Sequence, residues 1–514
     1  MKKSYLSNYL KLYFWQFFAI VLNFAAMLIV LPIISTNSEL FGIYSLCISI
    51  TIFLSYADIG FVSAGMKYAS EYFARKELKE EVGVTGFVLF VLSIGIIPYI
   101  CCMLWFWHDP NVIISNLSID LVPTASSMFL ILALFAPNLL FQKASQFIYG
   151  VRVEDYIARQ INIVGHILKI ISIFYFFRSG ESNIVGYFLF FQFINFLCFF
   201  IAVVYAGYLY RFPLLKLLQS INFSSQHFQL TKKLAFTSFF STIAWILYYE
   251  IDSLVIGKYF GVHSIAIYAV GLNILSFLRS IFGVIFSPLT ARFNHFVGVG
   301  DHNGLKLFYS RIILVLFPLL CFPIITIILL MQNLVLCWVG DAYKASIPIG
   351  QLLVATFLFA FLTYPAGILI MAYEKTKMIM GISAILVIIF WFGILIFGNQ
   401  LGMLAFSLFK FISYMVSVFI FTLFSIKILN KSIWVLSKKY LFAVSISVVT
   451  MVVFIIHFQK LLPLEKSTQN LLFVITTGIV ASFLSTALYF CLSKEFRREI
   501  LFLFRRLHQR FQFL

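Results

Sequence analysis

Seven ionisable side chains lie inside apolar stretches that are long enough to cross a lipid bilayer. Three are acidic and four are basic: Asp58, Glu250 and Asp252, and Lys143, Lys169, Arg279 and Lys410. An ionisable residue within a spanning helix costs roughly 2.5 to 3.5 kcal/mol on insertion, so such residues usually face a protein interior or a wet cavity. We therefore expect these residues to mark a polar path through a membrane protein.

The three lysines lie at different depths in their apolar runs. Lys169 is near the middle of 161–178, Lys410 in the outer half of 402–427, and Lys143 in the inner half of 127–150. A lysine deep in a bilayer cannot easily extend its charge to the surface, so it needs a wet cavity or an acidic partner. We predict that Lys169 and Lys410 line a cavity and bind an anionic group. Lys143, nearer the interface, either does the same or is structural.

Arg279 has three possible roles. The segment around Tyr44 and the segment around Tyr268 match at an offset of about 224 residues, and this offset carries Asp58 to position 282, close to Arg279 on the same helix face. An ion pair that gates the cytoplasmic end is one interpretation and a phosphate contact by Arg279 is another. The third is an internal salt bridge with a structural role.

Glu250 and Asp252 are two positions apart in the sequence, which is about 200° around a helix. They cannot share a face, so we expect one to point into a cavity and take part in proton or cation coupling while the other supports packing. The alternative is that both are structural.

The composition identifies an all-α polytopic membrane protein. The 514 residues are 62% hydrophobic and only 11% charged, whereas soluble domains carry about 25% charged residues. Apolar runs of near ~20 residues, the length that crosses the hydrocarbon core, fall at about fourteen places. These are 12–33, 41–62, 85–107, 127–150, 161–178, 185–210, 234–257, 264–288, 310–331, 349–372, 379–398, 402–427, 438–459 and 469–493.

The basic residues predict the orientation in the membrane. The net charge is +18, and roughly 28 lysines and arginines lie in one set of alternate connections against about five in the other, which places both termini in the cytoplasm. This alternation is a topology signal and not a continuous basic face, so we expect no nucleic-acid partner.

Other chemistry is not indicated by the sequence. The seven cysteines lie in or beside apolar runs without ligand spacing, so we expect inert thiols, no metal and no cofactor. The connections are short and carry no phosphate-binding glycine loop or nucleophile with a base, so we do not expect an enzyme.

The weak internal repeat predicts five parts. We expect an N-lobe at 1–210, a cytoplasmic linker at 211–233, a C-lobe at 234–430, two further helices at 431–493 and a tail at 494–514. Each lobe has an even number of spans, so the repeats are parallel. The basic tail KEFRREILFLFRRLHQRFQFL has helical periodicity and predicts an amphipathic helix on the inner leaflet, with docking of partner enzymes as the alternative.

Three stretches resemble a known family. YYEIDSLVIGKYFGVHSIAIYAVG, LPIISTNSELFGIYSL and the run YADIGF with KYASEYFARKE are similar to the polysaccharide transporters of the multidrug/oligosaccharidyl-lipid/polysaccharide (MOP) superfamily, which include the Wzx-type O-antigen and exopolysaccharide flippases. The resemblance implies two six-helix lobes in a V, with the two extra C-terminal helices appended. It also places Asp58, Glu250, Asp252 and Arg279 on helices that line the cavity between the lobes. The expected fourteen spans differ from the twelve of the commoner flippases in this family. The lipid II flippase branch of the superfamily also has fourteen.

The resemblance implies a transporter in the bacterial cytoplasmic (inner) membrane. The expected substrate is a polyprenyl-diphosphate-linked oligosaccharide for surface polysaccharide or lipopolysaccharide assembly. Its diphosphate would contact Arg279, Lys169, Lys410 and Lys143, and Asp58, Glu250 and Asp252 would serve gating or H+ or Na+ coupling. Membrane lipids, glycosyltransferases and a polymerase are the expected partners. A cation-coupled multidrug exporter, a lipid II flippase and a membrane polysaccharide polymerase or ligase are the alternatives.

Overall fold

The computed structural model describes residues 2–58, 60–178, 183–429 and 433–511. These residues are nearly all helical and include no strand. Helices suit a chain of this composition, because every backbone polar group in lipid must find its partner within the protein. The chain divides into two compact units, Met1–Ala269 and Val270–Leu514, which we call the N-terminal unit and the C-terminal unit.

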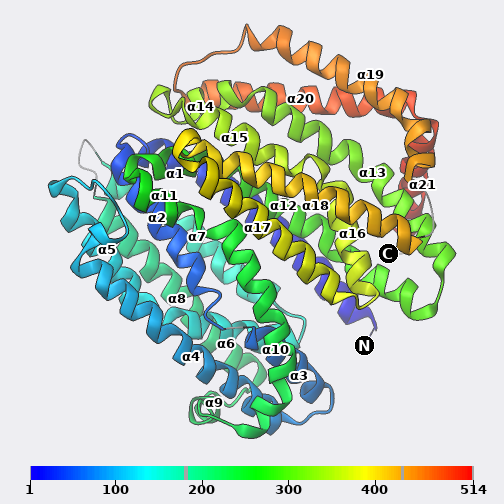
Figure 1. The fold of residues 1–514 in the computed structure, drawn as a ribbon. Helices are drawn as coiled ribbons and strands as arrows, with labels where there is room; N and C mark the ends of the chain where they lie inside the picture. The colour runs from blue at the N-terminus through cyan, green and yellow to red at the C-terminus, as the bar shows by residue number, and fades with distance from the viewer. Residues whose placement is uncertain (1, 59, 179–182, 430–432, 512–514) are drawn as a thin grey trace. The chain divides into compact units, whose positions relative to one another are not determined.

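The N-terminal unit contains eleven α-helices and the beginning of a twelfth (Figure 1). They are α1 (Lys2–Ile34), α2 (Ser38–Leu54), α3 (Phe61–Ala74), α4 (Leu78–His108), α5 (Val122–Phe135), α6 (Asn138–Val151), α7 (Tyr156–Phe176), α8 (Ile184–Tyr210), α9 (Leu214–Gln219), α10 (Ser225–Trp245), α11 (Asp252–Phe260) and the start of α12 (Val262–Val299). A π-helical turn, Ile246–Glu250, joins α10 to α11, and 3-10 turns lie at Pro110–Val112 and Ile119–Leu121.

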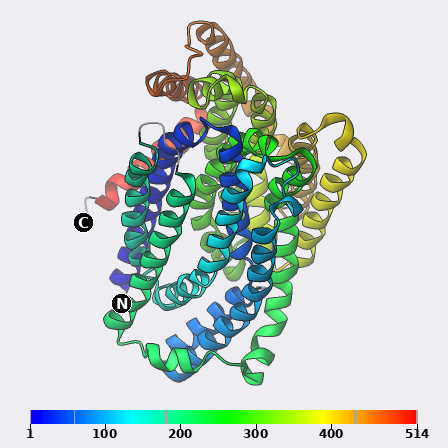
Figure 2. The same ribbon diagram turned by 90° about the vertical axis from the view of Figure 1, so that its left-hand side faces the viewer.

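Neighbouring helices of this unit pack as antiparallel pairs. α4 lies against α5, α7 against α8, and α3 against both α4 and α10. The short helix α9 packs on α4 at one end of the unit (Figure 2). A buried cluster that includes Leu92, Tyr149 and Ala206 fills the space between α4, α6 and α8.

The C-terminal unit holds the rest of α12 and nine further helices. They are α13 (His302–Leu329), α14 (Met331–Trp338), α15 (Ser346–Ala355), α16 (Ala360–Ala372), α17 (Thr376–Leu401), α18 (Leu404–Leu429), α19 (Ile433–Gln459), α20 (Thr468–Leu492) and α21 (Lys494–Phe511), with 3-10 turns at Asp341–Tyr343 and Thr356–Phe359. α17 packs along α18, and α19 lies beside α20, which packs on α13 (Figure 1).

The described helices agree with the predicted spans. Eleven are long and apolar enough to cross a membrane, and two bent pairs raise the number to thirteen. The bent pairs are 119–151, with 41° between its halves, and 238–260, with 44°. The remaining predicted run, 41–62, contains α2, which is apolar but has only 17 residues. The chain is therefore a multi-pass membrane protein, and the predicted count of fourteen is approximate.

One predicted element differs from the structure. The run 41–62 is not one helix, because α2 ends at Leu54 and α3 begins at Phe61. Gly60, in the break, has φ +79°, a conformation that ends a regular helix. The region 211–233, predicted as a linker, contains α9 and the first residues of α10, and α10 packs on α3 within the N-terminal unit. The lobe boundaries drawn from the sequence stay a prediction.

Candidate functional site

Lys169 is held inside the N-terminal unit by neutral groups. It lies on α7 with 6% of its surface exposed. Its ammonium donates a hydrogen bond to Oδ1 of Asn195 on α8 and lies 4.2 Å from the centroid of the Phe191 ring. The ring face carries negative potential and attracts a cation. The charge is therefore stabilised by an amide and an aromatic face.

A cavity of about 330 Å³ lies beside this lysine, within the N-terminal unit. Asn195 and Phe191 are among its walls, so the partners of Lys169 face both the ammonium and the cavity. We call it the N-unit cavity. Its other lining residues are Ile48, Thr51, Ile52, Leu54, Ser55, Tyr99, Leu132, Phe135, Asn138, Leu139, Gln142, Gln192 and Phe199.

Asp58 lies in the break between α2 and α3. Asp58 is buried, and its Oδ2 accepts a hydrogen bond from the backbone N–H of Val62 at 2.9 Å, in the first turn of α3. Lys143 lies on α6, close enough to Asp58 for electrostatic attraction. Asp58 therefore satisfies a backbone N–H group in the first turn of α3.

Glu250 and Asp252 lie where α10 gives way to α11. Glu250 ends the π-helical turn and accepts a hydrogen bond from the indole N–H of Trp245 at 3.2 Å. Asp252 begins α11, is fully buried, and accepts from the hydroxyl of Tyr268 at 2.5 Å. Each carboxylate thus accepts a hydrogen bond from an aromatic side chain within the segment 245–268, which offsets the cost of burial.

Arg279 and Lys410 belong to the C-terminal unit. Arg279 lies on α12 within electrostatic range of Tyr364, whose ring stacks on Phe286 at 4.6 Å. Lys410 lies on α18 with 1% of its surface exposed and its Nζ 5.3 Å from the centroid of the Phe390 ring on α17.

The predicted site residues are thus divided between the units. Asp58, Lys143, Lys169, Glu250 and Asp252 are in the N-terminal unit, and Arg279 and Lys410 are in the C-terminal unit. Of these, Asp58 and Lys143 lie within electrostatic range of each other. The described residues contain no group of three or more His, Cys, Asp or Glu that could hold a metal ion. The predicted roles in substrate binding and coupling stay predictions.

A buried ion pair near the end of α6 was missed by the sequence reasoning. Nη1 of Arg152 lies 2.8 Å from Oε1 of Glu81, and both side chains are almost fully buried. The guanidinium also lies 4.7 Å from the centroid of Phe73 and 4.9 Å from that of Tyr210. The sequence counts Arg152 as one more basic loop residue. No sequence signal distinguishes it from an exposed arginine.

The polar lining of the N-unit cavity was also missed, although the sequence carries a signal for it. Asn138 and Gln142 are four residues apart, and Gln192 and Asn195 are three apart, in otherwise apolar runs. Such spacings place amides on one helix face. Two amide pairs in separate spanning helices would have indicated a polar interior.

Comparison with known proteins shows similarity of fold. No family model matches the chain, and no curated protein matches its sequence. A solved structure of the lipid II flippase MurJ in an inward closed conformation aligns with a TM-score of 0.60 and 15% identity, over 90% of this chain and 99% of that one. The chain has the fold of the MOP superfamily transporters.

Two further solved structures have the same fold. An inward-facing multidrug resistance MATE family transporter aligns with a TM-score of 0.59 and 11% identity, over 80% of this chain and 94% of its own. A MOP superfamily transporter from Pyrococcus furiosus, described as having a binding pocket of reverse polarity, aligns with a TM-score of 0.56 and 12% identity, over 83% of this chain and 96% of its own. The predicted superfamily fold is therefore confirmed, and the branch within it is not assigned by these similarities.

Proposed function

We propose that this protein moves a polyprenyl-diphosphate-linked oligosaccharide from the inner to the outer leaflet of a bacterial cytoplasmic membrane, for assembly of O-antigen, capsule or exopolysaccharide. The observation that carries the proposal is the environment of Lys169. Its buried ammonium is bound by an amide and a ring face, and none of the acidic side chains that the structure describes forms an ion pair with it.

The four buried bases would have different tasks. Arg279 and Lys143 are the proposed direct contacts for the diphosphate, since neither is as deeply buried as the other two. Lys169 and Lys410 lie inside helix pairs and would act by their charge, because electrostatic interactions are stronger at low dielectric. A cationic path offsets the desolvation of a diphosphate, while the lipid tail stays in the bilayer.

The energy source would be the membrane potential or an ion gradient. Outward movement of one uncompensated negative charge gains about 2.3 kcal/mol per 100 mV at an inside-negative potential. Asp58, Glu250 and Asp252 are the proposed gating or H+ or Na+ coupling groups, and alternating access by rocking of two lobes would open each side in turn. Glycosyltransferases on the cytoplasmic side and a polymerase on the outer side are the proposed partners.

Reconstitution tests this function. Proteoliposomes that contain labelled polyprenyl-diphosphate oligosaccharide should expose the sugar on the far leaflet in the presence of the protein, as detected by an added lectin or glycosidase. Arg279→Ala should reduce the rate at least tenfold. Arg292→Ala is the matched control, because Arg292 lies on the same helix but is exposed. No exposure of sugar, or an unchanged rate in Arg279→Ala, would contradict the proposal.

Lipid II transport is the second candidate. The MurJ alignment covers 90% of this chain against 80% for the MATE transporter, so it accounts for more of the chain. The same vesicles loaded with lipid II distinguish the two substrates, and a cationic dye tests drug export. Faster movement of lipid II than of the oligosaccharide would favour the second candidate.

A further inference from the structure

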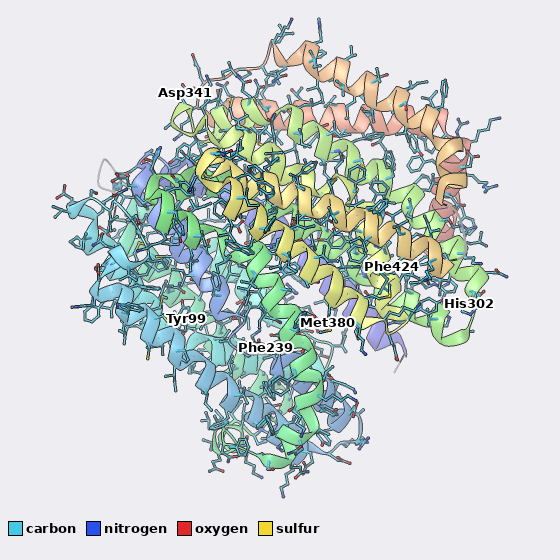
Figure 3. All side chains as sticks on the ribbon, in the orientation of Figure 1. Tyr99, Phe239, His302, Asp341, Met380 and Phe424 are labelled. Carbon is cyan, nitrogen blue, oxygen red and sulfur yellow. The ribbon has the colours of Figure 1, made fainter. Side chains whose placement is uncertain are left out.

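The N-unit cavity contains polar side chains that lack protein partners. Gln192 on α8 is 4% exposed and lines the cavity, and none of the side chains that the structure describes hydrogen-bonds to its amide group. Tyr99 lies on α4 (Figure 3). It lines the same cavity, and its hydroxyl is buried without a hydrogen-bond partner. A buried polar group left unpaired costs about 1 to 3 kcal/mol, so a ligand or water must satisfy these groups.

The orientation of Asn195 adds a third donor. Its Oδ1 accepts from Lys169, which leaves the NH₂ group on the other side of the amide, and Asn195 is part of the cavity wall. Two neighbouring hydroxyls already donate elsewhere, Thr51 to the carbonyl of Cys47 and Ser55 to that of Ile52. Asn195, Gln192 and Tyr99 therefore have donors that remain for a ligand.

The electrostatics of the cavity select the sign of the ligand. None of its lining residues is acidic. The Lys169 ammonium is a formal charge in direct contact with the wall, one hydrogen bond behind Asn195. A buried charge is costly unless another charge compensates it. A cation would be repelled here, whereas an anion would be stabilised both by the ammonium and by the N–H and O–H donors.

We propose that the N-unit cavity binds one small monovalent inorganic anion of the halide type, with Lys169 as its counter-charge and Asn195, Gln192 and Tyr99 as its hydrogen-bond donors. A single ammonium balances a single negative charge, and a dianion would leave one charge unpaired in an apolar bundle. The volume of 330 Å³ accommodates a halide with part of its hydration shell, since one water occupies about 30 Å³.

The site shares Lys169 with the proposed transport function, in which that lysine acts by its charge. It lies wholly within the N-terminal unit and uses none of the direct headgroup contacts proposed above. A halide in the cavity would stabilise the packing of α4, α7 and α8 around it, because a ligand that binds the folded state alone raises its stability. The test can therefore be made on the purified chain without any lipid-linked substrate.

Thermal unfolding in nanodiscs is the direct measurement. The full-length protein at pH 7 is titrated with sodium chloride, sodium bromide or sodium gluconate at constant ionic strength. We expect a saturable rise in Tm with chloride and bromide and no such rise with gluconate. Inorganic phosphate and sulfate, added in the same way, should not reproduce the chloride response.

Three substitutions locate the site. Lys169→Met should abolish the halide response, and Gln192→Leu and Tyr99→Phe should each weaken it, by roughly tenfold in the halide concentration at half effect for Gln192→Leu. Lys410→Met is the matched control, because Lys410 is equally buried over an aromatic ring but lies in the other unit. It should retain the response. Tyr99→Phe removes one oxygen atom and keeps the test decisive if Lys169→Met does not fold.

Specific outcomes would overturn the assignment. Equal Tm in chloride and gluconate, or a halide response that persists in Lys169→Met, would show that the cavity binds no halide through this lysine. A response to phosphate in place of chloride would assign the cavity to a phosphate group. Loss of oligosaccharide transport with an intact halide response would contradict the proposed function alone.

Discussion

At the scale of single residues, burial decides what each charge can do. Arg152 and Glu81 form a buried pair at 2.8 Å, while Lys67 and Glu71 form an exposed pair at 3.9 Å on one helix face. Removal of one partner from a buried pair leaves an uncompensated charge, whereas exposed pairs contribute about 0 to 1 kcal/mol. The two pairs thus provide a matched comparison within one unit.

Arg152→Ala should lower the free energy of unfolding by about 3 to 5 kcal/mol. The loss includes the ring contacts with Phe73 and Tyr210. Lys67→Ala should change it by less than about 1 kcal/mol. Denaturant or thermal unfolding in the same detergent measures both. Equal stabilities of the two variants would show that the Arg152 pair is not buried in the membrane-inserted protein.

His227 introduces a pH dependence at the start of α10, outside the spanning segments. Burial lowers the pKa of its imidazole, and Glu80, whose Oε2 lies 3.7 Å from Nε2, opposes that effect. The unfolded chain therefore binds a proton at a higher pH than the folded chain. Its contribution to stability is present above the unfolded pKa of about 6.5 and is lost as the pH falls below that value.

Unfolding measured from pH 8 to pH 5 tests this effect. Stability should fall on acidification, and His227→Phe should reduce the slope, because Phe cannot bind a proton. The difference between wild type and variant isolates the histidine from other groups. A difference that grows as the pH rises would have the wrong sign and would refute the assigned burial effect.

At the scale of elements, helix breaks position the charged residues. The break at Gly60 allows Asp58 to accept a hydrogen bond from the first turn of α3, and the π-helical turn at 246–250 separates the environments of Glu250 and Asp252. Neither break is visible in the hydropathy of the runs. Breaks within spanning helices are tolerated where neighbouring protein satisfies the freed backbone groups.

Gly60→Ala should destabilise the N-terminal unit. Gly60 has φ +79°, and a Cβ there would lie 2.5 Å from the carbonyl oxygen of Ala235 on α10. We expect a loss of at least about 1 kcal/mol, since alanine is strained at this φ and α3 must move from α10. Gly283→Ala is the control, because a Cβ at Gly283 has open space and alanine favours a helix by about 1 kcal/mol. In thermal unfolding, Tm should fall in Gly60→Ala and rise in Gly283→Ala.

At the scale of the whole molecule, the two units share a recurring arrangement. Lys169 on α7 lies over a ring of α8, and Lys410 on α18 lies over a ring of α17. In each unit, the buried lysine therefore sits in a contact between consecutive long helices. The lysine lies on the first helix of its pair in the N-terminal unit and on the second in the C-terminal unit, so the two positions are not equivalent under the predicted repeat.

Both termini should lie in the cytoplasm. The basic residues of the tail and of alternate connections predict this orientation, and the proposed anchoring of α21 on the inner leaflet requires it. A fluorescent protein fused after Leu514 should fluoresce in cells, whereas an alkaline phosphatase inserted at 463–466 should be active outside. The reverse pattern would invert the topology.

The sequence by itself determined the class of the protein, its helical runs, the predicted orientation and the resemblance to a superfamily. These depend on local quantities, namely the length and polarity of runs and the distribution of lysine and arginine. The helix breaks at Gly60 and at 246–250 depend on turn geometry within those runs, and hydropathy does not report it.

Only the tertiary structure decided the partners of the charges. Lys169 is paired with Asn195 across 26 residues and Arg152 with Glu81 across 71 residues. Such pairings depend on which helix faces meet, and the composition of a helix does not indicate which other helix packs against it. The N-unit cavity follows from the same cause, because it exists only where α2, α4, α5, α6 and α8 converge.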